Sequence, residues 1–405
     1  MELATRRHSQ IDPSGKHRRM RSPRVSRPSR RRFWVRRIGV LMLVFLVWLT
    51  WSVGGALMAP GTDTATAKLA EWARFNGMGW AVDELEQIQY QLNPPKVGGR
   101  LAGGIPEVST PRPTPTTRAT SKPKTTPKTP ALTALTAIPA QARPALPEEG
   151  VWQTLVSLHG QPAIQAAFLR PDAQHTSYLV GVAWLNQKLV TMVLHPGYSV
   201  PGGSGWSQPF YVPTSRRDAL LATFNSGFTM QDNNGGYWQD GKTAVPLRAG
   251  GASMVLFKDG HVDVLKWNAP APGPDVAAVR QNLGMLVENG KISADVNSTT
   301  TRTWGKTVGN ATFVWRSALG VCKDGSVVFV VGASMSVQTL ANIVHAAGAV
   351  NAMELDINQA WTNFMTYTHP SAGVAVPHML TKDAHPNPYR YLQTSSRDFV
   401  AVSAR

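Results

Sequence analysis

The chain has 405 residues, and 41 Lys and Arg residues against 24 Asp and Glu residues give it a net charge of +17 at pH 7. Most of this charge lies at the N-terminus and in one internal stretch. Residues 1–37 carry a net +11 and residues 98–147 a net +6, whereas residues 148–405 carry only +2. A nucleic-acid-binding domain carries its basic charge itself, so this distribution excludes nucleic acid as the expected partner.

An uncharged apolar run predicts one transmembrane helix over residues 38–58. At about 1.5 Å per residue this run covers roughly 30 Å, the thickness of a bilayer core. Arginines crowd residues 31–37, and the next basic residue is Lys68. The positive-inside rule then places the N-terminus in the cytoplasm and the later residues outside, as a single-pass protein of the cell membrane. A signal peptide cleaved near Gly54-Gly55-Ala56 is the alternative, and either interpretation exports the rest of the chain.

Composition and periodicity divide the chain into five segments. Apolar residues at helical spacing predict two short helices within residues 64–92, ended by Pro94-Pro95. The Pro-, Thr- and Lys-rich stretch that follows lacks apolar periodicity and is typical of an extended linker. The predicted segments are a basic cytoplasmic tail (1–37), the transmembrane helix (38–58), a membrane-proximal helical segment (59–97), the linker (98–147) and one folded domain (148–405).

Short apolar runs separated by turn residues predict strands throughout the folded domain. Three turns of one kind recur, at Lys258-Asp259-Gly260, Glu288-Asn289-Gly290 and Lys323-Asp324-Gly325. Asp-Gly or Asn-Gly between apolar runs is a strong hairpin signal. We therefore predict an α/β (α+β) domain of mixed, largely antiparallel sheets with few helices. The predicted strands are 151–158, 163–169, 178–185, 189–194, 219–224, 254–257, 262–267, 284–287, 318–321, 327–331, 352–355 and 399–402.

The stretch from Arg316 to Met365 organises this domain. After the hairpin, Ser336 is placed to cap a predicted helix over residues 337–347, which Gly348 ends. A short apolar run over residues 352–355 follows, and Asp356 comes directly after it. In open α/β sheets, ligands sit outside the carboxyl ends of strands, and this rule predicts a site at Asp356.

These residues carry a resemblance to the phosphodiester glycosidase family. That family shows an Arg-Thr-Ala-Ile-Gly-like run, which Arg316-Ser317-Ala318-Leu319-Gly320 resembles, then a Lys-Asp-Gly hairpin, a helix and Leu-Asp-Gly-Gly-Gly-Ser. Leu355-Asp356 begins the last motif, but Ile357-Asn358-Gln359-Ala360 stands where the glycines and serine would be, and a loop without glycine has less backbone freedom. Phe224-Asn225-Ser226-Gly227-Phe228 is similar to the family's Asn-Gly-Gly-Phe run. The resemblance spans roughly residues 215–400.

The resemblance implies hydrolysis of a glycosidic bond to phosphate. Such a reaction passes through an oxocarbenium-like transition state and needs a carboxylate. Asp356 is the predicted catalytic carboxylate, with a structural acid capping a loop as the alternative. Glu354, two residues earlier and so on the same strand face, is a second candidate, or else half of a strand-face salt bridge. Arg316 is the predicted phosphate ligand.

A loop rich in amides and rings, TMQDNNGGYWQDGK, follows Phe228 and resembles a carbohydrate platform, although Asn, Asp and Gly also form ordinary turns. Amide side chains can fix sugar hydroxyls, and aromatic rings can stack on a sugar face. An arginine beside Gly250-Gly251 suits a phosphate or is a surface residue. The predicted substrate-binding residues are Asn225, Gly227, Asn358, Arg248, Tyr237 and Trp238.

The sequence says less about partners and cofactors than about the fold. We predict no metal site, because the isolated His159, His175 and His195 lack partners at ligand spacing, and the sequence indicates no cofactor. Cys322 lies in an apolar run and is interpreted as a small buried hydrophobe. The expected partners are the lipid bilayer and a cell-surface or wall glycan. A non-catalytic glycan-binding domain on the same scaffold, or a structural wall-associated protein, are the alternatives to an enzyme.

Overall fold

The computed structural model describes residues 30–107, 135–233, 235–298, 301–305, 312–383 and 387–405. It divides the chain into two compact units, residues 1–55 and 56–405. Helix α1 (Arg30–Leu57) accounts for the described part of the first unit. Residues 33–57 of α1 are long and apolar enough to cross a membrane, a property shared by membrane anchors and signal sequences near an N-terminus.

Two short helices open the second unit, as the apolar spacing predicts. Helix α2 (Ala65–Phe75) begins at Thr64, whose hydroxyl accepts a hydrogen bond from the backbone N–H of Ala67. Helix α3 (Gly79–Leu92) follows and packs against α2. We call this pair the α2–α3 hairpin. Arg74 joins its two arms through Asp83 and Glu86, at 3.4 and 2.8 Å.

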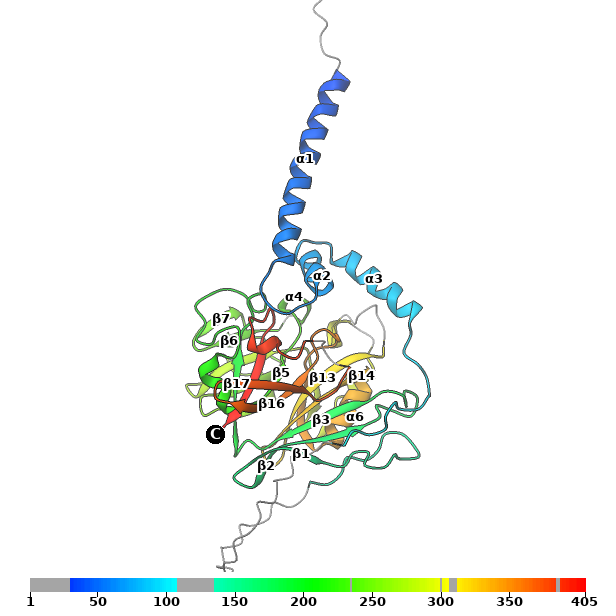
Figure 1. The fold of residues 1–405 in the computed structure, drawn as a ribbon, viewed down its shortest axis with the longest axis vertical. Coiled ribbons are helices and arrows are strands. Elements are labelled where there is room, and N and C mark those ends of the chain that lie inside the picture. The colour runs from blue at the N-terminus through cyan, green and yellow to red at the C-terminus, as the bar shows by residue number, and fades with distance from the viewer. Residues whose placement is uncertain (1–29, 108–134, 234, 299–300, 306–311, 384–386) are drawn as a thin grey trace, which may run out of the picture. The chain divides into compact units, whose positions relative to one another are not determined.

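Three sheets form the rest of the unit, and neighbouring strands in all of them pair antiparallel (Figure 1). The eight-stranded sheet has the order β1-β2-β3-β14-β13-β15-β11-β12. Its strands are β1 (Gln153–Leu158), β2 (Gln161–Leu169), β3 (Val180–Leu185), β11 (Met285–Glu288), β12 (Lys291–Ile292), β13 (Val314–Cys322), β14 (Val327–Met335) and β15 (Ala349–Glu354).

Two five-stranded sheets complete the domain, with the orders β7-β6-β10-β8-β9 and β17-β16-β5-β18-β4. The first contains β6 (Tyr237–Gln239), β7 (Lys242–Val245), β8 (Ala252–Phe257), β9 (Val262–Lys266) and β10 (Val276–Gln281). The second contains β4 (Val190–His195), β5 (Leu220–Asn225), β16 (Phe364–Ser371), β17 (Val374–Met379) and β18 (Phe399–Ala404). The remaining helices among the described residues are short, namely α4 (Met230–Asn233), α5 (Thr301–Trp304), α6 (Val337–Ala346) and the 3-10 turns 214–219, 294–297 and 390–392.

The eight-stranded sheet is apolar on both faces. Along β14, Phe329 and Val331 pack into a core shared with the two five-stranded sheets, whereas Val328 and Val330 pack under helix α6. This alternation is the period of two that a strand imposes on its side chains. The hydroxyl of Ser336 caps α6 by accepting from the N–H of Thr339 at 3.0 Å, as predicted.

The structure confirms largely antiparallel sheets with few helices. It corrects the argument from parallel sheets, because β15 runs antiparallel to β13 and Asp356 therefore lies beside the beginning of β13. The sequence prediction missed β6, β7, β10, β16 and β17. Part of the predicted linker, residues 135–147, packs on the domain with Ile138 buried, and residues 108–134 lie outside the described residues.

Candidate active site

Asp356 lies one residue beyond Leu355, where the chain leaves β15. Its backbone is held by Ser317 of β13, whose N–H donates to the Asp356 carbonyl at 2.8 Å and whose hydroxyl accepts from the Asp356 N–H at 3.1 Å. One carboxylate oxygen accepts from the N–H groups of Ile357 and Asn358, at 2.7 and 3.0 Å. These two bonds form an Asx turn that fixes the side chain. The other oxygen, Oδ2, remains for a further partner.

That partner is Arg397, which precedes β18. Its Nη1 lies 3.9 Å from Asp356 Oδ2, and its guanidinium stacks on the Trp361 ring with 4.5 Å between Cζ and the ring centroid. Arg397 Nε donates to Glu71 of helix α2 at 2.7 Å. One guanidinium therefore lies between two carboxylates, one from the sheet domain and one from the α2–α3 hairpin.

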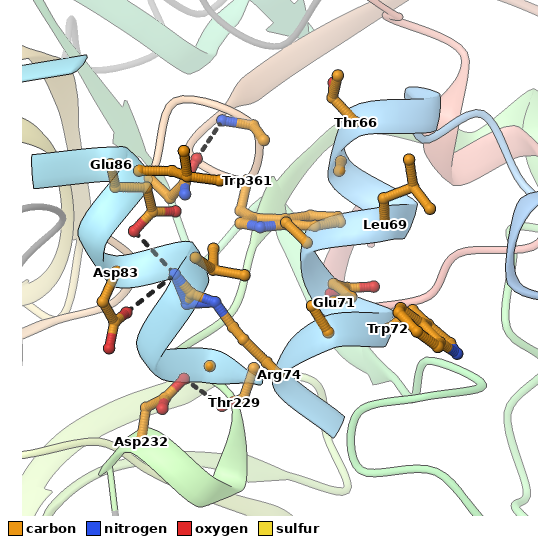
Figure 2. A pocket seen from close by; sticks show the side chains of 18 of the residues that line it. Thr66, Leu69, Glu71, Trp72, Arg74, Asp83, Glu86, Thr229, Asp232 and Trp361 are labelled. Carbon is orange, nitrogen blue, oxygen red and sulfur yellow. Dashed lines mark hydrogen bonds and ion pairs between the residues drawn. The ribbon is translucent and has the colours of Figure 1, made fainter. Parts of the chain in front are cut away.

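A cavity of about 1140 Å³ opens at these residues. Its floor is formed by the segments that carry Phe228, Asp232, Asp356 and Arg397, and its roof is the α2–α3 hairpin. Figure 2 shows Arg74 reaching across from α2 to Asp83 and Glu86 of α3, with Trp361, Thr229 and Asp232 of the sheet domain beside the two helices. A volume of this size accommodates a small ligand, because ligand pockets run to roughly 300–1,000 Å³.

Burial changes the ionisation of the two central groups. It raises the pKa of Asp356 to about 6, although the Arg397 charge and the two turn N–H groups oppose the rise. Burial lowers the pKa of Arg397, but the Glu71 and Asp356 carboxylates outweigh it and raise that pKa above its ordinary value. Asp356 therefore changes its charge close to neutral pH, whereas Arg397 stays a cation. A carboxyl with a raised pKa inside a cavity is a common feature of catalytic sites.

Arg316 and Glu354, the other two predicted catalytic residues, form a buried ion pair with each other. Arg316 also donates to the carbonyls of Met335 and Thr312, at 2.8 and 3.2 Å. Neither side chain lines the Asp356 cavity. The expectation that Glu354 and Asp356 share a strand face does not apply, because β15 ends at Glu354 and the turn redirects Asp356.

Asn225 and Gly227 lie beneath the site and hold its segments together. The Asn225 amide donates to Ser317 Oγ at 2.9 Å, and its Oδ1 accepts from the N–H of Asn363 at 2.9 Å. A Cβ on Gly227 would come within 2.9 Å of Asn282 Oδ1. Glycine is required there by packing. Asn358 lines the cavity, with its Oδ1 accepting from the N–H of Ala360 at 2.9 Å.

The predicted carbohydrate platform is not at this cavity. Tyr237 is fully buried in the main core, where its hydroxyl donates to Gln239 at 2.8 Å, so its ring offers no free face. Trp238 is half-buried against a separate small cluster, and Arg248 is exposed with its backbone bonded to Gln281. The structure thus brings together Asp356 and Asn358, and it adds Arg397, Trp361, Asp232 and the α2–α3 hairpin, which the sequence reasoning missed.

No metal site is evident near these residues. Within the described ranges, no three His, Cys, Asp or Glu side chains converge closely enough to hold a metal ion. The histidines His369, His378 and His385 near the C-terminus lie nine and seven residues apart, which is a weak metal-ligand spacing; His378 bonds to Thr368 at 2.9 Å, and His385 lies outside the described residues. Cys322 is partly buried, and burial raises the pKa of its thiol to about 11, which does not suit a nucleophile.

Comparison with known protein families gives a match within the domain. Residues 218–356 match the sequence model of the phosphodiester glycosidase family. The match confirms the resemblance inferred from the Arg316 and Asp356 motifs, and it ends at Asp356. Arg397 and the α2–α3 hairpin lie outside the matched residues. No curated protein sequence matches the chain significantly.

Solved structures similar to the chain include the catalytic domain of zebrafish N-acetylglucosamine-1-phosphodiester alpha-N-acetylglucosaminidase, auto-inhibited by its pro-peptide. It is 15% identical, with 63% of this chain and 88% of that chain covered and a TM-score of 0.40. A hypothetical protein from Synechocystis is 13% identical, with 61% and 63% covered and a TM-score of 0.31. A protein of Burkholderia pseudomallei K96243 described as exported is 12% identical, with 58% and 75% covered and a TM-score of 0.35.

Proposed function

We propose that the protein is an exported, membrane-anchored hydrolase that cleaves the bond between a sugar and a phosphate in a surface glycan or wall polymer. One observation carries the proposal, namely the buried Asp356 carboxyl, fixed by its turn at the wall of a cavity and facing the Arg397 cation. The match of residues 218–356 to the phosphodiester glycosidase family supports this class of reaction.

The reaction adds water across one bond. The bond between the anomeric carbon and the phosphate oxygen breaks, water supplies a hydroxyl to the carbon, and a phosphate monoester leaves with the bonding electrons. An ionised Asp356 stabilises the positive charge that develops on the sugar, or attacks it, or activates the water. Because a phosphate monoester is a good leaving group, the site needs less help from a strong general acid.

The test uses the full chain in detergent micelles and a panel of glycosyl phosphodiesters, with release of free sugar as the readout. We expect the wild type to release sugar from at least one member and Asp356→Asn to lose this release. Asp324→Asn is the matched control, because Asp324 forms the same kind of turn, accepting from the N–H of Ser326 at 2.9 Å, on an exposed hairpin. Equal turnover by Asp356→Asn would remove Asp356 from the chemistry.

A non-catalytic glycan-binding domain is the second candidate, favoured by Ile357-Asn358-Gln359-Ala360 in place of the family's glycine-rich run. Asn358 lines the cavity and could hold a sugar without any chemistry following. If no diester is hydrolysed, while wild type and Asp356→Asn bind wall glycan equally well, this candidate replaces the enzyme.

The membrane anchor is proposed from α1 and the arginines on its N-terminal side. Its orientation can be tested by labelling, because the burial that raises the thiol pKa of Cys322 to about 11 keeps that residue unreactive. Ser121→Cys should react with a membrane-impermeant maleimide on intact cells, whereas Ser9→Cys should react only after lysis. The reverse pattern would invert the proposed topology.

A further inference from the structure

The α2–α3 hairpin places a carboxylate against the arginine that faces Asp356. Glu71 Oε1 accepts from Arg397 Nε at 2.7 Å, and the side chains of Glu71 and Arg397 are only 13% and 12% exposed. Asp356 approaches another nitrogen of the same guanidinium, at 3.9 Å. The contact between Glu71 and Arg397 thus lies directly beside the proposed catalytic group.

We propose that Arg397 is the anion-binding residue of the site, and that the Glu71 carboxylate occupies the position that a phosphate group of the substrate takes. This inference rests on the proposed function and names the binding residue for the phosphate. A guanidinium presents donors in a planar fork that matches carboxylate and phosphate oxygens alike. Stacking on Trp361 holds the plane of this fork fixed.

The other arginines near the site are already engaged. Arg316 is buried in its pair with Glu354. Arg74, on the hairpin, is paired with both Asp83 and Glu86. Arg390 donates to Ala360 at 2.6 Å and to Asp63 at 3.1 Å. Arg397 combines a cation facing the cavity with direct proximity to Asp356, as a phosphate next to the scissile bond requires.

With the hairpin in place, the cavity repels an anionic ligand. Five acidic side chains line it, against the two arginines Arg74 and Arg397, and the acids are Glu71, Asp83, Glu86, Asp232 and Asp356. A phosphate must therefore displace Glu71 from Arg397, which makes the hairpin an internal competitor for the site. The cavity is large enough for phosphate to enter once the Glu71 side chain is removed.

Helix α2, the part of the hairpin that carries Glu71, buries little against the sheet domain. Helix α2 has no buried residue, whereas α3 buries Val82 and packs Tyr90 against the apolar cluster of Phe228, Leu283, Val314 and Ile357. The polar contacts of the hairpin with the sheet domain include the Glu71 contact and, just before α2, those of Asp63, which accepts from Arg390 and from the hydroxyl of Ser396 at 2.6 Å. Helix α2, which carries Glu71, therefore has little apolar surface to expose when it leaves Arg397.

The test measures binding and requires no turnover. Inorganic phosphate is titrated calorimetrically into the full chain in detergent micelles, for the wild type, Glu71→Ala and Glu71→Ala/Arg397→Gln. We expect Glu71→Ala to bind phosphate at least about tenfold more tightly than the wild type. The double variant should lose the gain, and Glu71→Ala/Arg397→Lys should keep part of it. Glu84→Ala, which removes an exposed carboxylate of α3 outside the cavity, should behave as the wild type.

The outcomes separate this inference from the proposed function. If Glu71→Ala gains phosphate affinity through Arg397 and no diester is ever hydrolysed, Arg397 stands as an anion site and the enzyme proposal fails. If diesters are hydrolysed but phosphate affinity is the same with and without Glu71 or Arg397, the inference is overturned while the enzyme remains. Tryptophan fluorescence of each variant checks that it is folded.

Discussion

Two carboxylate–arginine pairs lie at the end of β15, their acids two residues apart in sequence, and they differ in separation and in access to the cavity. Glu354 and Arg316 are in direct contact and almost fully buried, and two further N–H groups of Arg316 donate to backbone carbonyls. Asp356 and Arg397 are 3.9 Å apart at a cavity wall, and a helix outside the sheet domain supplies the closest partner of Arg397. We call them the closed pair and the open pair.

The difference shows how a site can be recognised. In the closed pair each nitrogen of the arginine already bonds to the protein and neither side chain lines the cavity, so the pair is not placed to bind a ligand. In the open pair Asp356 Oδ2 and the Arg397 guanidinium lie at the wall of the cavity, within reach of a ligand bound there. Leaving buried charge incompletely paired costs stability, and a fold tolerates that cost where function requires it.

The largest expected effect is on kcat, and it distinguishes Asp356 from Glu354. Asp356→Asn should lower kcat by about 10²–10⁴-fold, the usual contribution of a positioned proton-transfer or charge-stabilising group. The turn should survive, because an asparagine Oδ1 can accept the same two N–H bonds. Glu354→Gln should reduce the amount of folded protein and leave kcat of the folded fraction unchanged. Active-site titration alongside kinetics measures both, and a kcat loss in Glu354→Gln at normal stability would contradict the division into open and closed pairs.

The next effect concerns the stability of the closed pair. Arg316→Met should lower the free energy of unfolding by about 3–5 kcal/mol, because it leaves the buried Glu354 charge without its partner. Replacing both residues, as Arg316→Met/Glu354→Leu, should recover most of the loss, since no buried charge remains. Urea unfolding followed by tryptophan fluorescence gives the values. A double variant no more stable than the single one would mean that the backbone bonds of Arg316 dominate.

The open pair should make the stability of the folded state depend on pH. The raised pKa of Asp356, about 6, means that the folded state holds this proton more tightly than the unfolded state does. The cost of burying the ionised carboxylate is therefore fully present above pH 6 and disappears as the pH falls toward 4, a change of about 3 kcal/mol at most. Asp356→Asn should remove this pH dependence from urea unfolding midpoints.

Turnover should fall as the pH falls, whereas stability should rise. The reaction uses the ionised carboxylate, so turnover should fall as the pH drops through about 6, where Asp356 becomes protonated. A pH–rate profile of the wild type measures this directly. Activity that rises below pH 6 would assign Asp356 the role of a proton donor.

The sequence predicted the hairpins and helix α6 well for a physical reason. Hairpins such as 318–331 and helix α6 are encoded locally, by Asp-Gly turns, period-two apolar runs and a serine cap. Strands β16 and β17 were missed because His369, Pro370 and Pro377 break their apolar pattern. The pairing of β16 with β5, and of β17 with β16, is a tertiary property that no local window contains.

The site was predicted only in part, because its two halves come from distant segments. Asp356 follows a recognisable strand, so its position could be inferred. Arg397 carries no local signal, and its relation to Asp356 exists only once β18 pairs with β5. Arg316 was chosen for its motif, yet motif position does not show whether a guanidinium faces a cavity or a buried glutamate. The covering by α2 likewise depends on contacts across more than 300 residues of sequence.

The smallest expected effect is on the hairpin that covers the open pair. Asp63→Asn weakens the bonds to Arg390 and Ser396, and hydrogen bonds to a charged group contribute about 1.5–3 kcal/mol. A loss of about 1.4 kcal/mol corresponds to tenfold faster amide exchange in α2, if exchange occurs by local opening. Hydrogen–deuterium exchange should show this acceleration in α2 and α3 while α6 is unchanged, and Glu84→Gln should leave both hairpin helices as in the wild type. Unchanged exchange in Asp63→Asn would mean that apolar contacts hold the hairpin. Phosphate would then be unable to displace the hairpin only by competing with Glu71 for Arg397.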